Sequence, residues 1–173
     1  MSEPDLELES RRVIYQRIAN TPGIHFRALL EELEYAQGTL QYQLRWLADE
    51  GLIEASDDGK YTRYYPAAEF DEAEQAVMNA LRREYSRRIL AHLLADGPLS
   101  TSVLSDRLEK ANSTVSWHLS NLADAGLVTR ERDGRSVVYE VTDPDRVRYL
   151  YTVHRRSFTD RIVDRLLGLW DSY

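Results

Sequence analysis

Two short stretches of the chain are rich in side chains that form hydrogen bonds without carrying a charge. Residues 111–121 (ANSTVSWHLSN) combine asparagines, serines, a threonine and a histidine with one tryptophan. Residues 36–45 (AQGTLQYQLR) offer glutamines, a threonine, a tyrosine and a single arginine. Amide and hydroxyl groups both donate and accept hydrogen bonds, so they suit the recognition of polar edges. We therefore expect these stretches to bind a partner.

Catalytic groups with workable partners are absent from the sequence. The chain has no cysteine, which removes disulfides, thiolate metal sites and thiol redox chemistry. The four histidines are scattered, without a second histidine or a carboxylate at metal-site spacing on one helix; they are His25, His92, His118 and His154. Phosphate-binding loops, dinucleotide fingerprints and nucleophile motifs are also missing. We expect no enzymatic activity, no metal and no cofactor.

An internal repeat supplies the framework that positions the two stretches. Residues 36–54 match residues 111–129 at an offset of 75, and eight of the nineteen positions are identical. The match continues backwards at an offset of 76, from 10–14 to 86–90, and forwards from 58–60 to 133–135. Each copy therefore spans about sixty residues, which is more than chance similarity of one helix would explain. Two domains of one fold are predicted.

Apolar spacing within each copy predicts three helices followed by a β-hairpin. In the first copy the first stripe stops at the breaker cluster 20–23, and Gly51 ends the third helix. The segments 57–59 and 133–134 have the residues of a hairpin turn. The apolar positions are Val13, Ile14, Ile18, Phe26, Leu29, Leu30, Leu33, Leu40, Leu44 and Leu47 in copy one, and Ile89, Leu90, Leu93, Val103, Leu104, Leu108, Val115, Leu119 and Leu122 in copy two. The fold class is thus mainly α with small β-hairpin wings, arranged as two tandem winged helix-turn-helix domains.

The remaining segments connect and follow the two domains. Residues 71–81 contain neither glycine nor proline, so a linker helix is expected over 71–83, between domain 1 (1–70) and domain 2 (84–143). Asp143-Pro144 is a good helix start, and a long C-terminal helix is expected to about Trp170 within a dimerisation segment, 144–173. An apolar stripe on a terminal helix needs a partner, so we expect a homodimer interface at Val147, Leu150, Tyr151, Phe158, Ile162, Leu166 and Leu169.

The motifs around the first helix-turn-helix resemble those of archaeal winged helix-turn-helix transcriptional regulators, which are broadly related to the MarR and ArsR families. The resemblance rests on residues 22–27 (PGIHFR), 38–40 (GTL), Leu44, Leu47 and 50–53 (EGLI), followed by a glycine-containing wing. It covers nearly the whole chain, and it implies a DNA-binding regulator of transcription that is commonly dimeric. The sequence departs from that pattern where a serine and a basic residue usually open the recognition helix, since Ala36-Gln37 and Ala111-Asn112 stand there.

The third helix of a helix-turn-helix lies in the major groove of DNA, and its outward residues meet base edges and phosphates. In copy two the expected DNA contacts are Asn112, Ser113, Thr114, Ser116, Trp117, His118, Ser120 and Asn121, with Arg130, Arg132 and Arg135 on the wing. In copy one they are Gln37, Thr39, Gln41, Tyr42 and Arg45, with Lys60 and Arg63 on the wing. Packing inside the protein is an equally good interpretation of Tyr42 and Trp117. Copy two is favoured as the main DNA-binding domain, with copy one as a weaker binder or a regulatory module.

The chain has a net charge of −7, and its charged residues are unevenly distributed along the sequence. Residues 1–70 hold 7 basic and 13 acidic side chains, whereas residues 144–173 hold 6 basic and 4 acidic ones. Only 2 of the 22 basic residues are lysines, against 29 acidic residues, which is typical of proteins from a very salty cytosol. An ordinary acidic protein with arginine-biased codons is the alternative explanation. Acidity opposes nonspecific binding to DNA, but high salt removes most of the counterion contribution to affinity, so that neutral recognition groups become workable. With no apolar run that could span a bilayer and an acidic N-terminus, we expect a cytoplasmic protein.

Two further interpretations remain open at the level of sequence. The acidity of copy one favours, as an alternative, an adaptor whose winged helices bind the proteins of the transcription machinery instead of DNA. A small-molecule effector is compatible with either function, since aromatic residues could line a cleft between the domains. The aromatic residues considered for that cleft are Tyr61, Tyr64, Tyr149 and Tyr151.

Overall fold

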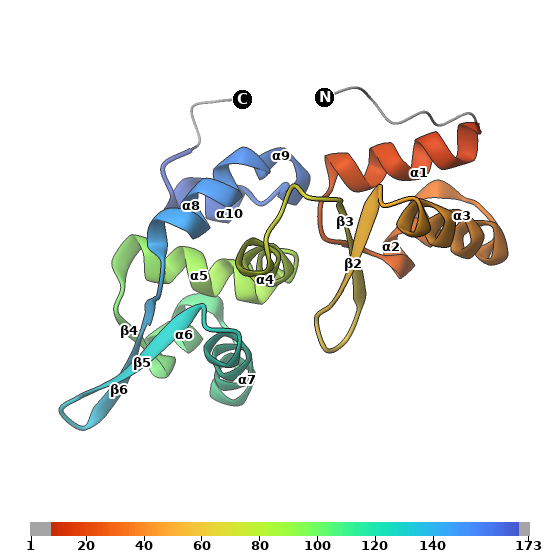
Figure 1. Ribbon diagram of the computed structural model, residues 1–173. Helices are drawn as coiled ribbons and strands as arrows, with labels where there is room; N and C mark the ends of the chain where they lie inside the picture. Colours follow the sequence, from red (N-terminus) through yellow and green to blue (C-terminus); the bar gives the residue numbers. More distant parts are fainter. Residues whose placement is uncertain (1–7, 170–173) are drawn as a thin grey trace. The chain divides into compact units, whose positions relative to one another are not determined.

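Each copy of the repeat folds into three helices and a three-stranded antiparallel sheet (Figure 1). The computed structural model describes residues 8–169. The chain divides into two units, Met1–Gln75 (unit 1) and Ala76–Tyr173 (unit 2). The division falls within helix α4 (Glu72–Leu81), inside the segment 71–83 that was expected as a linker helix.

Unit 1 has the element order of a winged helix-turn-helix. Its elements are α1 (Glu9–Asn20), β1 (Ile24–His25), α2 (Phe26–Leu33), α3 (Gln37–Asp49), β2 (Ile53–Asp57) and β3 (Thr62–Pro66). The strand order is β1-β3-β2, so the hairpin β2–β3 forms the wing and β1 adds a short third strand to it. The predicted stripes meet in one core, where Ile14, Ile18, Leu29, Leu40 and Leu47 have no exposed surface.

Unit 2 repeats this arrangement element by element. Its elements are α5 (Glu84–Asp96), β4 (Leu99–Ser100), α6 (Thr101–Leu108), α7 (Asn112–Asp124), β5 (Val128–Asp133) and β6 (Ser136–Val141), with strand order β4-β6-β5. Local features are repeated too, because both second helices end on a glutamate in the left-handed conformation, Glu34 at φ 58° and Glu109 at φ 54°. The predicted core positions Ile89, Leu90 and Leu104 are fully buried. The predicted fold class is therefore confirmed.

The expectation of one long C-terminal helix is wrong. Three helices occupy the segment, namely α8 (Pro144–Val153), α9 (Arg155–Phe158) and α10 (Arg161–Leu166). The chain turns at Thr159, whose φ of 49° is left-handed, and the Asp160 carboxylate then accepts a hydrogen bond from the Val163 N–H to cap α10. Arg87 and Arg88 of α5 both donate to the same Asp160 carboxylate, at 2.9 and 3.3 Å. These buried ion pairs stabilise the turn between α9 and α10. The chain breaks the helix there, and α10 packs against α5.

The apolar stripe of this segment belongs largely to the core of unit 2. Four of its seven residues, Val147, Leu150, Tyr151 and Phe158, are at most 7% exposed, and α10 packs against α5. The Tyr151 and Phe158 rings stack at 5.1 Å. These four residues therefore cannot form the predicted dimer interface, because they already pack inside their own chain. Of the other three, Ile162 is exposed and Leu166 and Leu169 are half-buried.

Over residues 8–169, no helix combines the length and the apolar character needed to cross a membrane.

Candidate nucleic-acid interface

Helix α7 of unit 2 presents a polar outward face. Its apolar residues Val115, Leu119 and Leu122 are buried in the core, which turns the intervening positions to solvent. The predicted contact residues Asn112, Ser113, Ser116, Trp117, Ser120 and Asn121 are exposed, and Thr114 and His118 are half-buried. Trp117 is 54% exposed, so of the two interpretations of this residue the structure favours a free surface over packing inside the unit.

His118 links this face to the helix behind it. The Oγ atom of Ser86, in α5, lies 3.4 Å from His118 Nδ1, and the His118 ring contacts those of Tyr85 and Trp117 with centroid distances of 5.9 and 5.0 Å. Burial lowers the pKa of His118, and the Arg83 guanidinium lowers it further, so the ring is neutral at pH 7. His118 is thus placed to orient Trp117 and is less accessible than its neighbours.

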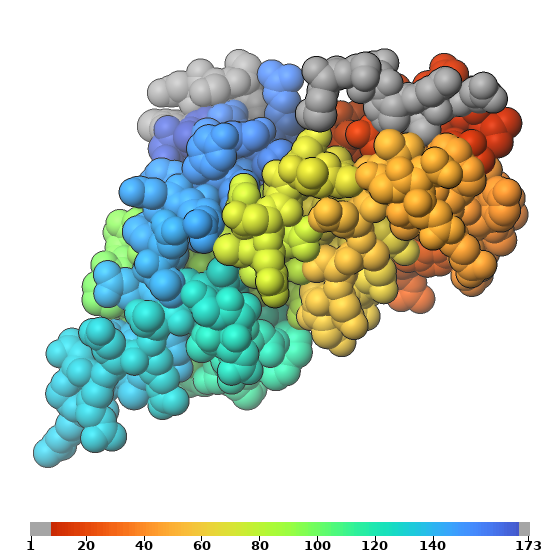
Figure 2. Space-filling view, in the orientation of Figure 1, coloured from red at the N-terminus to blue at the C-terminus, as the bar shows by residue number. Residues whose placement is uncertain are grey.

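Two arginines of the wing of unit 2, Arg130 and Arg132, lie on one face of strand β5. Hairpin β5–β6 pairs Arg130 with Tyr139 and Arg132 with Val137, and it projects as a narrow finger from its unit (Figure 2). Successive residues of a strand point to opposite faces, so Arg130 and Arg132 share a face that Glu131 does not. Arg130, Arg132 and Arg135 are all exposed. The wing thus offers exposed positive charge on the face that Arg130 and Arg132 share.

Helix α3 of unit 1 also has an exposed face, but a less uniform one. Gln37, Thr39, Gln41, Tyr42 and Arg45 are exposed, and Tyr42 at 63% has no role in the core. Gln43 and Trp46 of the same helix instead contact Arg11 of α1. There the Arg11 guanidinium lies 3.4 Å from the centre of the Trp46 ring and donates from Nε to Gln43. Arg11 is therefore engaged inside unit 1.

The prediction of Arg63 as a DNA contact is wrong. Arg63 is 2% exposed; its Nε atom lies 2.5 Å from Asp58 Oδ2 and its Nη1 donates to the Gly23 carbonyl at 2.9 Å. Burial alone raises the pKa of the Asp58 carboxyl, but the N–H groups of Tyr61 and Lys60 and the Arg63 guanidinium outweigh it and lower the pKa to about 2. The arginine is used to close the turn of its own hairpin. Lys60 remains exposed at that wing.

The arginine pair at the start of α5 is likewise engaged inside its unit. Arg87 and Arg88 hold Asp160, and Arg87 also donates to the Leu81 carbonyl at 2.8 Å. Asp160 is 73 residues from Arg87 in the sequence, and Leu81 lies before the start of α5. Helix periodicity alone could therefore not reveal either partner. Both arginines are therefore engaged inside unit 2.

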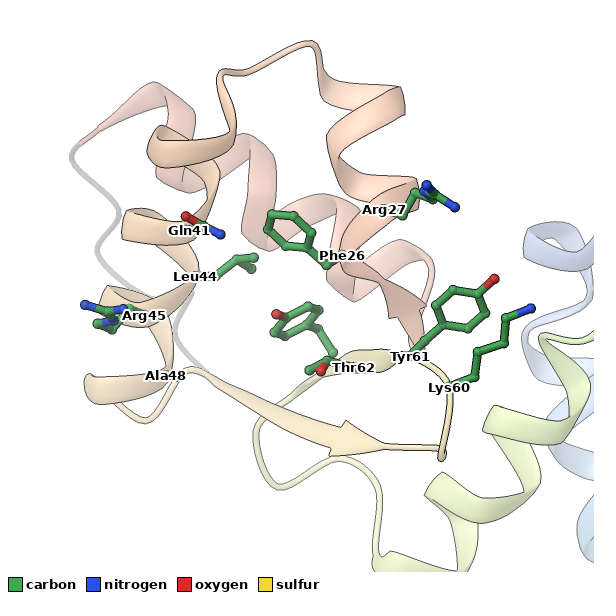
Figure 3. Close-up of a pocket in the computed structure, with 10 residues that line it drawn as sticks. Phe26, Arg27, Gln41, Leu44, Arg45, Ala48, Lys60, Tyr61 and Thr62 are labelled. Carbon is green, nitrogen blue, oxygen red and sulfur yellow. The ribbon is translucent and has the colours of Figure 1, made fainter.

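A groove in unit 1 contains residues that the sequence did not single out. It lies between α3, the first turn of α2 and the wing, and it brings Phe26, Arg27 and Ala48 together with the predicted residues Gln41 and Arg45 (Figure 3). Tyr61 and Tyr64, which were expected in a cleft between the domains, line this groove within one unit. Tyr151, expected beside them, is buried in the core of unit 2. The spacing of Gln41, Arg45 and Ala48 on one helix face was the available signal.

The arrangement defines two winged helix-turn-helix units, each with a polar recognition helix. A family model described as an N-terminal HTH domain matches residues 8–78, and one described as a helix-turn-helix domain matches residues 81–131. An uncharacterized HTH-type transcriptional regulator of Methanocaldococcus jannaschii is 30% identical over 135 residues, which are 78% of this chain and 34% of that protein. The chain thus matches about a third of the length of this relative.

Two further relatives match less than half of the chain. A putative arsenical resistance operon repressor, ArsR, of Halobacterium salinarum is 38% identical over 72 residues, which are 41% of this chain and 56% of that protein. The transcriptional activator HlyU of Vibrio cholerae is 33% identical over 79 residues, which are 46% of this chain and 72% of that protein. The solved structure of HlyU has a TM-score of 0.43 and 31% identity, and it covers 49% of this chain and 90% of its own.

The chain belongs to the ArsR-type winged helix-turn-helix transcriptional regulators, and it carries two helix-turn-helix domains in tandem. The resemblance that the sequence motifs indicated is therefore confirmed. Because these relatives are regulators of transcription, the expectation that the chain is not an enzyme is confirmed as well.

Proposed function

We propose that this protein regulates transcription in the cytoplasm by binding duplex DNA sequence-specifically as a homodimer, and that unit 2 makes most of the contacts. The observation that carries the proposal is the pairing of two surfaces on unit 2. The outward face of α7 exposes neutral hydrogen-bonding groups and Trp117, and the adjacent wing exposes three arginines. The first surface suits base edges in the major groove, and the second suits phosphates or a minor groove.

Recognition by α7 relies on hydrogen bonds and shape. Asn112 and Asn121 can pair with adenine edges, the serines can bond to several bases, and Trp117 offers a flat surface to sugars or thymine methyl groups. Neutral groups release few counterions, so this part of the affinity weakens little as salt rises. Arg130, Arg132 and Arg135 supply the salt-dependent part.

Of the predicted stripe, only Ile162 is exposed, so a dimer contact through the C-terminal segment would use largely other residues. Large apolar side chains that remain exposed there are Tyr149 at 64%, Val153 at 55% and Ile162 at 49%. Tyr149 and Val153 are four residues apart on α8, so they lie on one helix face. We propose this face as the dimer contact that places two copies of unit 2 on the half-sites of a pseudo-palindromic site. Tyr149→Ser with Val153→Ser should yield monomers by analytical ultracentrifugation; a dimer that persists contradicts this interface.

The test of DNA binding is selection from a pool of random duplexes at several salt concentrations up to molar. The protein should enrich a symmetric motif, and changing Arg130, Arg132 and Arg135 to Ala should weaken binding to it and reduce the slope of log K against log salt by up to about 3. Arg161→Ala, which removes an exposed arginine from α10, is the matched control and should leave both unchanged. An unchanged slope in the triple variant would contradict the assignment of the wing.

A protein adaptor is the second candidate function, and the acidity of residues 1–70 favours it. Six more acidic than basic side chains there oppose the approach of DNA and suit a basic protein surface. The selection experiment separates the two functions, since an adaptor enriches no DNA motif at any salt concentration.

A further inference from the structure

The groove of unit 1 is a built site of about 700 Å³ (Figure 3). One wall is a single face of α3, at positions 41, 44, 45 and 48. The other walls are the first turn of α2, the residues of the wing turn that precede β3, and the start of β3 itself. Pockets for small ligands typically measure roughly 300 to 1,000 Å³, so the groove is large enough for an organic molecule.

The floor of the groove is apolar and partly aromatic. Phe26 and Leu44 reach its centre from two helices (Figure 3), and both also pack on the core of unit 1. Burial raises the pKa of the Tyr64 hydroxyl, which keeps this ring neutral. Tyr61 is held by stacking on His25, with a distance of 4.2 Å between ring centres. A flat apolar body would therefore find contacts that are already in place.

The rim of the groove is cationic. Arg27, Arg45 and Lys60 line it and are exposed, and no carboxylate is among its lining residues. Within residues 8–169 these three cations form no ion pair, whereas Arg17 and Arg63 of the same unit are both paired with carboxylates. Three cations that line the groove from different sides without an ion pair, in a unit whose sequence is acidic overall, indicate an anionic occupant.

The second copy of the repeat carries serine at three of the positions that line this groove, although Lys60 and Tyr64 align with Arg135 and Tyr139. Equal helix lengths align Arg27 of α2 with Ser102 of α6, and the offset of 75 aligns Arg45 with Ser120. The same offset aligns Tyr61 of the first wing with Ser136 of the second. Two domains of one fold therefore differ where the groove lies, with large cationic or aromatic side chains in one and serine in the other. The fold itself does not require the groove residues.

We infer that this groove binds a compact organic anion with a flat apolar body, such as an aromatic carboxylate. The cations of the rim would hold the carboxylate through charge-assisted hydrogen bonds, and the aromatic floor would take up the body. A phosphodiester backbone needs the cations but not the apolar floor, which is why a small molecule fits these observations better. Because Gln41 and Arg45 also belong to the outward face of α3, the bound anion covers part of the surface that this unit would offer to DNA; this consequence rests on the proposed function.

The experiment uses 2-naphthoate as the probe and its neutral analogue 2-naphthamide as the ligand control, with ¹⁵N-labelled full-length protein observed by NMR. Naphthoate should shift the amide signals of α3 and the wing of unit 1, and naphthamide should bind at least about tenfold more weakly. Arg27→Ser with Arg45→Ser should weaken naphthoate binding at least about tenfold, since serine stands at both aligned positions of unit 2. Arg17→Ser removes an arginine outside the groove and should leave the affinity unchanged.

Several outcomes would overturn the site. Equal affinity for the two probes, or no loss in the double variant with a well-dispersed spectrum, would show that charge at the rim is not used. Groove shifts produced by a random 12-base-pair duplex and not by naphthoate would assign the cations to the DNA backbone. Naphthoate binding is measured in the absence of DNA. The proposal of an anion site can therefore fail while the proposed DNA-binding function holds, and the reverse. With a selected DNA site, naphthoate should then weaken binding of the wild type and not of the double variant.

Discussion

Replacing Asp58 by Asn should destabilise unit 1 by about 2 to 5 kcal/mol at pH 7. The pKa of Asp58 lies at about 2 in the folded protein against an ordinary 3.8, and at 1.36 kcal/mol per unit this difference corresponds to about 2.4 kcal/mol. The substitution keeps an acceptor for the Tyr61 and Lys60 N–H groups but leaves Arg63 buried at 2% exposure without its counter-charge. Removing one member of a buried pair typically costs about 3 to 5 kcal/mol, which sets the upper end.

The pH dependence provides a second, independent measurement of the same pair. Because the folded-state pKa of Asp58 is depressed, its contribution to stability is fully present above about pH 4 and is lost as pH falls through about 2. Wild type should therefore lose stability between pH 5 and pH 2 more steeply than the Asp58→Asn variant.

The assay is urea unfolding followed by the fluorescence of Trp46, in a background where Trp117 and Trp170 are changed to Phe so that unit 1 alone is observed. Asp57→Asn is the matched control. Exposed Asp57 accepts a hydrogen bond from the Gly59 N–H, and its replacement should cost about 0.5 kcal/mol. In a double-mutant cycle with Arg63→Met the two losses should be far from additive. A loss below about 1 kcal/mol for Asp58→Asn, or additive losses, would refute the account of the buried pair.

Three further predictions concern stability elsewhere in the chain. Tyr151→Phe removes the hydroxyl that donates to buried Asp164 at 2.6 Å, and it should lower the free energy of unfolding by about 1.5 to 3 kcal/mol in urea titrations; a neutral result would contradict that bond. Phe158→Ala should cost about 3 to 5 kcal/mol by thermal unfolding without changing the oligomeric state in ultracentrifugation, and a stable monomer would restore the predicted interface. Glu34→Gly relieves a left-handed φ and should raise Tm, whereas Glu31→Gly inside α2 should lower it.

The repeating elements could be predicted from the sequence because their signals are local. Leu40, Leu44 and Leu47 follow helix spacing, and all three are buried where the stripe put them. The exposure of the α7 side chains could be predicted from the same helix spacing, because the positions that are not buried in the core face the solvent. The contacts that such residues make with DNA stay a prediction.

What could not be predicted depends on contacts between residues distant in the sequence. Arg63 donates to Gly23, 40 residues away, and no local pattern distinguishes it from the exposed Lys60. The bond between Arg87 and Asp160 joins residues 73 positions apart, and it is this bond that accompanies the break in the expected final helix. An apolar stripe shows that a helix needs a partner, but it does not say whether that partner is the same chain or another.

The serines on the outward face of α7 bear on how selective such a helix can be. An arginine or lysine that is immobilised on binding loses roughly 2 kcal/mol of rotamer entropy, whereas a serine has a single side-chain torsion to order. Short side chains also bring the helix backbone itself closer to whatever it contacts. A surface of this kind has few alternative conformations with which to accommodate an ill-fitting sequence. A single wrong base pair would leave hydrogen-bond donors of the helix unsatisfied, because no side chain could rearrange to bond with it. The mismatch would then cost the full binding free energy of those hydrogen bonds.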